Sequence, residues 1–337
     1  MRIHFWSADE AGSGVYRAIL PGMSLQWLGH QVSGGMLLPE DWQELDVVVG
    51  CRVAKSAPSR AWRTMKARGI RLVLDLDDDY LHLDPSNEAA YRVWSDPAMR
   101  KGLLDNMALA DTVTCCSEPL AAVMRDYHGD VRVVPNGLPA QYLGQPRDYD
   151  PEVLSVGWAG TSSTVAELPM AVRALTRIAQ YPRPGGVAVR LVGIDAAQAV
   201  GLGMRGKGMG ALGWVPNFGH YLQAVSAFDV WVAPYRDIAF NRAKYPTKFL
   251  EASMLGIPLI ASDIEPYRRV IRHGENGFLV KREHQWGRYL KRLVDDPDLR
   301  QRMGMAARAE ASGAILQALN RQWEAALSAP AVERTAA

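Results

Sequence analysis

The chain has 337 residues, of which 48% are hydrophobic and 22% charged, and its formal net charge is +2. These values exclude a disordered chain and allow two globular domains. No apolar run approaches the roughly 20 residues that a membrane-spanning helix needs, and because the chain enters a predicted strand at once we expect no signal peptide. Its three cysteines are too few for a disulfide framework, and no histidine is spaced for zinc. We therefore expect a cytoplasmic protein without a metal site.

The first half of the chain alternates short apolar segments with amphipathic ones. Strands rich in Val, Ile and Leu are predicted over residues 3–6, 45–50, 72–74, 112–115 and 131–134. Helices are predicted over residues 15–28, 60–68, 89–110 and 120–127. This alternation favours parallel strands joined by crossover helices, and the turn signal Pro135-Asn136-Gly137 closes the half.

The second half repeats the alternation after a break. Residues 138–152 carry Pro, Gly, Gln, Asp and Tyr with little periodicity and predict a linker. Strands are then predicted over 153–158, 188–192, 213–215, 230–233 and 259–261, and helices over 165–179, 221–227, 247–255 and several segments after 283. Two consecutive α/β halves predict two Rossmann-like domains facing a cleft, in which ligands bind at the carboxyl ends of strands.

The stretch from Lys244 to Ser262 predicts a loop, a helix and a buried strand. Pro246 suits the first turn of a helix, where its missing N–H has no consequence. Thr247 would then leave backbone N–H donors free for a phosphate, with Lys244 and Lys248 flanking the helix start and Glu251 one turn further on. The alternative is a surface helix whose charged side chains are simply solvated.

This stretch resembles the nucleotide-sugar site of retaining glycosyltransferases of the GT-B fold, in glycosyltransferase family 4, also called group 1. The family pattern runs Glu, seven residues, Glu, and Glu251 matches the second glutamate. The match implies that its carboxylate accepts hydrogen bonds from the ribose hydroxyls of the donor. The first glutamate, which normally touches the transferred sugar, is replaced here by Ala243. Weaker landmarks in the family order extend the resemblance over nearly the whole chain, at residues 14–17, 110–114, 134–137, 156–160, 228–234 and 274–278.

The resemblance implies an α/β GT-B fold in which two Rossmann-like domains face a cleft. The first would comprise residues 1–137, with an acceptor site, and the second residues 153–313, with the nucleotide-sugar site. Residues 138–152 would link them. A C-terminal helix at 314–328 would cross back to the first domain.

Further donor contacts are expected from loops that follow predicted strands. Glycines after the first strand would let the backbone approach a phosphate, although an ordinary tight turn is the alternative. Many relatives place an arginine at the position of Trp158, so the cation for the leaving diphosphate is expected here from Lys248, Lys244 or Arg242. The predicted donor-binding set consists of Gly12, Ser13, Gly14, Trp158, Gly160, Trp214, Val215, Arg242, Lys244, Thr247, Lys248 and Glu251.

An acidic run from Asp75 to Tyr80 ends a strand of the first half and is therefore expected to face the cleft. Its carboxylates could bind an acceptor hydroxyl or act as a base; metal coordination is the less favoured alternative, because enzymes of this fold are generally metal-independent. Helix N-capping is the structural alternative for at least one of them. The candidate catalytic residues are Asp77, Asp78 and His82, and the acceptor-binding candidates beside them are Tyr16, Arg17 and Asp79.

A basic run completes the predicted acceptor side. From Arg52 to Arg71 there are seven Lys or Arg residues and no acid. Arg60, Arg63 and Lys66 would share one face of a helix. That face is either simply solvated or contacts a polyanionic acceptor or an anionic membrane surface.

The predicted activity is transfer of a hexosyl or pentosyl group from a nucleotide-diphosphate sugar to an acceptor hydroxyl, with retention of configuration. UDP-sugars are the first expectation and GDP-sugars the second, and no metal or other cofactor is required. The candidate acceptors are a hydroxymethylated pyrimidine in DNA, which would make this a DNA-modifying enzyme, a glycolipid or other surface glycan, and a protein. Two alternatives remain: a nucleotide-sugar epimerase or hydrolase on the same fold, and a non-catalytic nucleotide-sugar-binding protein.

Overall fold

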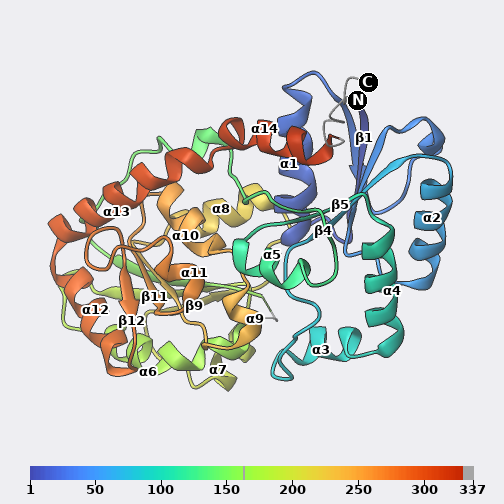
Figure 1. The fold of residues 1–337 in the computed structure, drawn as a ribbon. Helices are drawn as coiled ribbons and strands as arrows, with labels where there is room; N and C mark the ends of the chain where they lie inside the picture. The colour runs from blue at the N-terminus through green and yellow to red at the C-terminus, as the bar shows by residue number, and fades with distance from the viewer. Residues whose placement is uncertain (162–163, 329–337) are drawn as a thin grey trace. The chain divides into compact units, whose positions relative to one another are not determined.

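The computed structural model describes residues 1–161 and 164–328, which form two compact units (Figure 1). Unit 1 comprises residues 1–81, 94–137 and the C-terminal segment from Ile315, and unit 2 comprises residues 82–93 and 138–314. Each unit carries one parallel six-stranded sheet with helices packed against it. Two such units are the α/β architecture that the alternating strand and helix signals predict.

The sheet of unit 1 has the strand order β2-β1-β3-β4-β5-β6. Every residue of its strand β3 is buried, because helices cover a parallel sheet on both faces. The first strand thus lies between the second and the third, and the chain leaves β1 and β3 in opposite directions. The strands are β1 (Arg2–Trp6), β2 (Gln31–Gly35), β3 (Val47–Cys51), β4 (Arg71–Leu76), β5 (Thr112–Cys115) and β6 (Val131–Val133).

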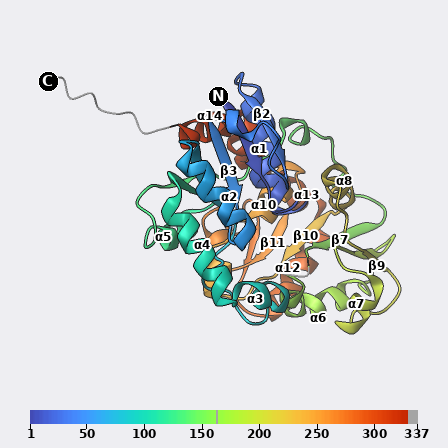
Figure 2. The same cartoon turned by 90° about the vertical axis from the view of Figure 1, so that its right-hand side faces the viewer.

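The C-terminal helix of the chain belongs to unit 1, as expected for this fold. α14 lies beside α1 in both views (Figure 1 and Figure 2). Its Trp323 packs edge-on against Phe5 of β1, with ring centroids 5.9 Å apart. The helices of unit 1 are α1 (Leu20–Gln26), α2 (Ser56–Ala67), α4 (Pro97–Leu109), α5 (Glu118–Met124) and α14 (Leu316–Leu327), with a π-helical turn at Val15–Ile19 and a 3₁₀ turn at Trp42–Glu44; α3 (Glu88–Trp94) spans the boundary with unit 2.

The sheet of unit 2 has the strand order β12-β11-β10-β7-β8-β9. Its first strand, β7, and its fourth, β10, are hydrogen-bonded neighbours. The chain therefore runs from β7 toward one edge of the sheet and from β10 toward the other edge. The strands are β7 (Leu154–Ala159), β8 (Val187–Val192), β9 (Met209–Leu212), β10 (Val230–Ala233), β11 (Leu259–Ser262) and β12 (Phe278–Val280).

Helices of unit 2 cover this sheet, with α6 packed against α12 and α10 against α13. They are α6 (Pro169–Ile178), α7 (Ala196–Gly201), α8 (Phe218–Ser226), α9 (Ala239–Arg242), α10 (Thr247–Met254), α11 (Glu265–Arg268), α12 (His284–Asp295) and α13 (Pro297–Ala311), with 3₁₀ turns at Ala140–Tyr142, Val165–Glu167 and Ser312–Ala314. Among the described residues no helix combines the length and the apolarity needed to cross a bilayer.

Some predicted elements differ from the observed ones. The strand predicted at 213–215 is wrong: β9 ends at Leu212, and the apolar residues that follow it are loop. Two edge strands were not predicted, because β2 is rich in Gly and polar residues and β12 has only three residues. The helix predicted at 89–110 is two helices, since Asp96 caps a new one that starts at Pro97.

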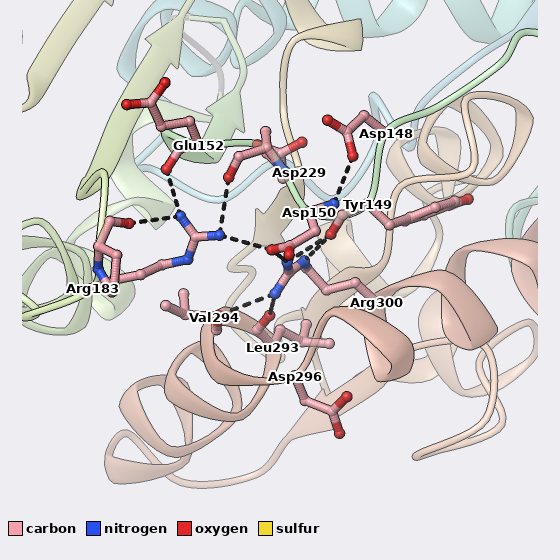
Figure 3. A network of polar contacts seen from close by, with 12 residues as sticks. Asp148, Tyr149, Asp150, Glu152, Arg183, Asp229, Leu293, Val294, Asp296 and Arg300 are labelled. Atoms are coloured by element: carbon pink, nitrogen blue, oxygen red, sulfur yellow. Dashed lines mark hydrogen bonds and ion pairs between the residues drawn. The ribbon is translucent and has the colours of Figure 1, made fainter.

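Three arginines bond the segment predicted as a linker to the rest of unit 2, and Figure 3 shows Arg183 and Arg300 among them. The buried Arg300 of α13 donates to the carbonyl oxygens of Tyr149 (2.6 and 2.9 Å) and Leu293 (2.6 Å). Arg183 donates to the carbonyl of Glu152 (2.7 Å), and Arg147 pairs with Asp229 (3.0 Å) and also donates to backbone carbonyls. These bonds order residues 147–152 although their sequence lacks periodicity, because the guanidinium groups satisfy backbone acceptors that no regular element satisfies.

Candidate functional site

Glu251 is the centre of the candidate site in unit 2. Its helix, α10, buries Phe249, Leu250 and Ala252 in the core and ends at Met254, just before Gly256, whose φ of +68° favours glycine. This packing leaves Glu251 only 3% exposed. The Tyr221 hydroxyl of α8 donates a 3.0 Å hydrogen bond to Glu251 Oε2. A buried carboxylate held by a phenol is oriented before any ligand arrives.

Buried tyrosines surround this carboxylate. The rings of Tyr235 and Tyr267 lie 5.8 Å apart, and both side chains are less than one tenth exposed. Burial, reinforced by Glu251, raises the pKa of Tyr221 well above its ordinary value. Burial also raises the pKa of Tyr267, with Tyr235 adding to the effect. The phenols of Tyr221 and Tyr267 therefore stay protonated and act as hydrogen-bond donors.

Two lysines lie near the start of α10. Lys248 is half-buried, and burial lowers its pKa, although the nearby Glu251 favours the charged form. The Nζ of Lys244 lies 4.1 Å above the ring of Phe240. The N–H of Thr247 donates to Tyr245 O at 2.8 Å and is therefore not among the free backbone donors expected at this helix start. The positive charge at this helix start thus comes from side chains.

The remaining predicted donor residues divide by burial. Trp158 is 1% exposed inside β7 and packs in the core, so it has no surface for a nucleotide, contrary to the prediction. Gly160 directly follows β7, and a Cβ on this residue would lie only 2.4 Å from Thr164 Oγ1, so the position requires glycine. Trp214 is 51% exposed and Val215 half-buried beyond β9, so both remain accessible.

Arg242 and Ala243 end the short helix α9. Arg242 is exposed, and its Nε pairs with Asp237 Oδ1 at 2.7 Å. Ala243 is 3% exposed, in the position where the resemblance expects a sugar-contacting glutamate. Arg242 therefore reaches a ligand only by leaving its ion pair.

The sequence analysis missed a polar cluster beyond β10. Glu167 is 4% exposed, and its carboxylate accepts bonds from Arg236 Nε (3.0 Å) and from Asn241 Nδ2 (2.9 Å). Arg236 follows β10 by three residues, which is the signal that could have identified it. The cluster lies at the carboxyl edge of the sheet, where open α/β sheets bind ligands.

A cavity of about 220 Å³ opens elsewhere in unit 2. Its walls come from α10, from the segment after α11 and from the end of α13, and neither Glu251 nor Lys248 lines it. The α10 residues that do line it are Phe249, Leu250 and Ser253, which lie on the opposite face of the helix. The cavity is therefore separate from the site around Glu251.

In unit 1 the glycine loop after β1 is a tight turn built around Asp9. Asp9 Oδ1 accepts the N–H of Gly14 (2.9 Å), and Asp9 Oδ2 accepts the Ser13 hydroxyl (3.2 Å). Gly12 has a φ of +55°, and a Cβ on Gly14 would lie 2.0 Å from the carbonyl oxygen of Asp9. The structural alternative thus accounts for both glycines.

Arg52 lies beside this loop, after β3, and its φ of +55° is uncommon outside glycine. It pairs with Asp9 and donates to the Tyr80 hydroxyl (3.2 Å), while its Nε lies 3.7 Å from Asp77 Oδ1. Tyr80 in turn donates to Asp77 at 2.7 Å. Burial opposes ionisation of Asp77, but Arg52, Tyr80 and Ser13 together hold its pKa below the ordinary value. Such a carboxylate is a weak base and suits an anchoring role better than proton abstraction.

The neighbouring acidic residues have different surroundings. Asp78 is half-buried, whereas Asp79 is 2% exposed and accepts the N–H of Leu81 at 3.1 Å. This bond closes a local turn and caps no helix, because the next helix, α3, begins at Glu88. His82 is exposed and is assigned to unit 2. No group of three or more side chains suited to a metal ion occurs among the described residues.

Arg17 is a structural residue rather than an acceptor contact. It is 1% exposed, and its guanidinium donates to both carboxylate oxygens of Asp75 (2.6 and 3.0 Å), to Val134 O (2.6 Å) and to Asn136 Oδ1 (3.1 Å). Tyr16, the residue before Arg17, is 8% exposed. The prediction of acceptor binding by Arg17 is corrected by this burial, because Asp75 of β4, Val134 and Asn136 after β6, and Trp323 of α14 enclose the side chain.

The basic run forms a smaller patch than its sequence indicates. Arg60 and Arg63 are exposed on α2, opposite the buried Trp62. Lys66 pairs with Asp111 at 2.6 Å, and the guanidinium of Arg68 lies 5.4 Å above the Trp42 ring. Acids distant in sequence therefore neutralise part of the run.

Comparison with known proteins adds to these observations. Residues 210–310 match the family model described as glycosyl transferases group 1. A phosphatidyl-myo-inositol mannosyltransferase of Mycobacterium leprae is 24% identical over 236 residues, and the chain spans 62% of the length of that relative.

Solved structures share the fold over almost the full chain. Anabaena HepE, in complex with UDP and glucose, matches with a TM-score of 0.69 at 16% identity, covering 98% of this chain and 100% of that one. Sucrose-phosphate synthase from Thermosynechococcus elongatus matches with a TM-score of 0.67 at 16% identity, covering 96% and 98% of the two chains. At these identities the likeness establishes a two-domain GT-B fold.

Proposed function

Because the chain belongs to the group 1 glycosyl transferases with a GT-B fold, we propose that it transfers a sugar from a nucleoside-diphosphate sugar to an acceptor hydroxyl. The buried Glu251 carries the proposal, since Tyr221 orients its carboxylate as an acceptor for the vicinal hydroxyls of a ribose. Lys244 and Lys248 lie near the same helix start, where a diphosphate would be bound. HepE has been solved with UDP and with UDP-glucose, which makes UDP-sugars the first donors to test and GDP-sugars the second.

In the proposed reaction the anomeric configuration is retained. The bond between the sugar C1 and the diphosphate oxygen breaks, and the acceptor oxygen forms a bond to C1 on the same face. The departing phosphate oxygen takes the acceptor proton, so the products are a glycoside and a nucleoside diphosphate. The protein contributes positioning and stabilisation of the charge on the leaving group. Asp78, near the anchored Asp77, is the proposed contact for the acceptor hydroxyl.

For the acceptor we retain two candidate classes with an anionic surface, hydroxymethylated DNA and a glycolipid. The exposed Arg60 and Arg63 support this choice, whereas Lys66 is already paired with Asp111. The double variant Arg60→Glu/Arg63→Glu should slow transfer to such an acceptor and weaken its salt dependence. If both the rate and the salt dependence are unchanged, the patch is only a solvated helix face.

The test of the proposed function is thermal unfolding with UDP, GDP, ADP, their sugar conjugates and NAD, followed by product analysis. Saturation at about 100 times the Kd should add roughly 2.7 kcal/mol of stability. The stabilisation should disappear in Glu251→Gln and persist in Glu310→Gln, a matched change of an exposed glutamate that pairs with Arg272. Donor isomerised or hydrolysed without transfer would favour the epimerase or hydrolase alternative, and binding without turnover the non-catalytic one. A response to NAD alone would refute the proposal.

A further inference from the structure

Unit 2 has a topological switch point between β7 and β10. The two strands are neighbours, but the chain leaves β7 toward β8 and leaves β10 toward β11, on opposite sides. In open α/β sheets a crevice for ligands forms outside the carboxyl ends of such a strand pair. Arg236 follows β10 by three residues, and Glu167, in the 3₁₀ turn after β7, lies against it. The pair therefore occupies the place where this unit is built to bind a ligand.

The surrounding residues fix the guanidinium of Arg236. Glu167 Oε2 accepts both the backbone N–H of Arg236 (2.9 Å) and its Nε (3.0 Å), and Oε1 accepts Nη2 (3.2 Å). Asn241 donates to Glu167 Oε1 (2.9 Å) and to the carbonyl oxygen of Arg236 (3.0 Å). Since Glu167 is only 4% exposed, the carboxylate acts as a rigid support. A ligand of Arg236 would thus meet a cation that has little rotamer freedom left to lose.

The outer edge of the same guanidinium is accessible. The side chain of Arg236 is 37% exposed, and within residues 1–161 and 164–328 its Nη1 has no hydrogen-bond partner. Its Nη2 also donates to the Ser86 hydroxyl and lies 3.9 Å from Asp84 Oδ1, contacts that a phosphate oxygen could replace. A planar fork of N–H donors suits bidentate recognition of phosphate.

We propose that Arg236 binds the diphosphate of the nucleotide sugar and that Glu167 and Asn241 are its positioning residues. This inference rests on the proposed function and identifies a residue outside the predicted donor set. Trp158 is enclosed in the core, so β7 supplies no cation at this edge. Arg236 complements the lysines near α10, because it adds positive charge on a guanidinium whose orientation Glu167 fixes.

The test is calorimetric titration of the full chain with UDP and with uridine, or with GDP and guanosine if the protein prefers guanine. Arg236→Gln should weaken UDP binding roughly tenfold or more, the loss expected for charge-assisted hydrogen bonds, and leave uridine binding within about twofold. Inorganic pyrophosphate should compete with UDP in the wild type and fail to do so in the variant. The control is Arg269→Gln, which makes the same chemical change at an exposed arginine paired with Glu265.

A second variant separates binding from folding. Arg236→Gln leaves Glu167 without its cation and can destabilise unit 2, whereas Glu167→Gln/Arg236→Gln removes both charges. The double variant should recover thermal stability but not UDP affinity. Recovery of both would overturn the proposal, since Arg236 would then serve only as the counterion of Glu167. A wild type that binds no nucleoside diphosphate would refute the proposed function as well, whereas equal loss of UDP and uridine affinity in Arg236→Gln would refute this inference alone.

Discussion

Replacing Arg17 by methionine separates a structural role from an acceptor-binding one. The change keeps a long unbranched side chain and removes the guanidinium. Asp75 then loses two hydrogen bonds and its counter-charge, and retains the one donated by Thr114 at 2.7 Å. Val134 O and Asn136 Oδ1 lose their bonds from the guanidinium too.

The magnitude follows from the burial of the pair. The side chains of Arg17 and Asp75 are 2% and 1% exposed, so solvent does not screen their interaction. Removing one partner of such a pair leaves an uncompensated buried charge and costs about 3–5 kcal/mol. For a unit of about 150 residues, each kcal/mol corresponds to roughly 2–4 °C. We therefore expect the melting of unit 1 to shift down by roughly 6–20 °C.

The assay is thermal unfolding with hydrogen exchange resolved by segment, which identifies the unit that melts. The control is Arg125→Met, which breaks the exposed pair with Glu118 (48% and 56% exposed) and should cost no more than about 1 kcal/mol. Similar stability of the two variants, together with a higher acceptor KM in Arg17→Met, would refute the reasoning. Arg17 would then be accessible to the acceptor after all.

Three further predictions concern unit 2. Burial lowers the pKa of Lys248 below its ordinary 10.5, so in the interval below pH 10.5 the unfolded chain binds more protons than the folded chain and the wild-type free energy of unfolding rises with pH. Lys248→Met should abolish this rise. Matching pH–stability curves of the two proteins would contradict the prediction. Tyr221→Phe should weaken UDP binding by about tenfold in calorimetry, because it removes the hydrogen bond to Glu251, and an unchanged Kd would place ribose elsewhere. Gly157→Ala should destabilise by roughly 1–3 kcal/mol, because its Cβ would lie 2.1 Å from an aromatic ring, whereas Gly287→Ala in α12, with no atom within 4 Å, should stabilise by about 0.5–1 kcal/mol; thermal melts with the opposite order would refute the packing argument.

The amino-acid pattern alone was sufficient for the architecture. Alternating apolar and amphipathic segments specify the parallel strands and helices locally, since strand and helix periods differ. The same is true of the α10 region, where the proline at its start, Glu251 and Gly256 are close in sequence. The pattern failed at β2 and β9, edge strands that bury little and therefore carry little hydrophobic signal, and at β12, which has only three residues.

Only the tertiary structure decided which charged residues are supports and which are available. The residues next to Arg17 and Arg236 in the sequence do not distinguish the two arginines, yet one is enclosed with Asp75 and the other keeps an exposed edge beside Glu167. Arg52 and Asp77, 25 positions apart in the chain, approach each other because β3 and β4 are neighbours in the sheet. Exposure and ion pairing depend on the partner that another strand brings close, and no local pattern encodes that partner. The sequence thus determined the fold and the place of the candidate site around Glu251, and the packing around the two sheets determined which cations remain for a ligand.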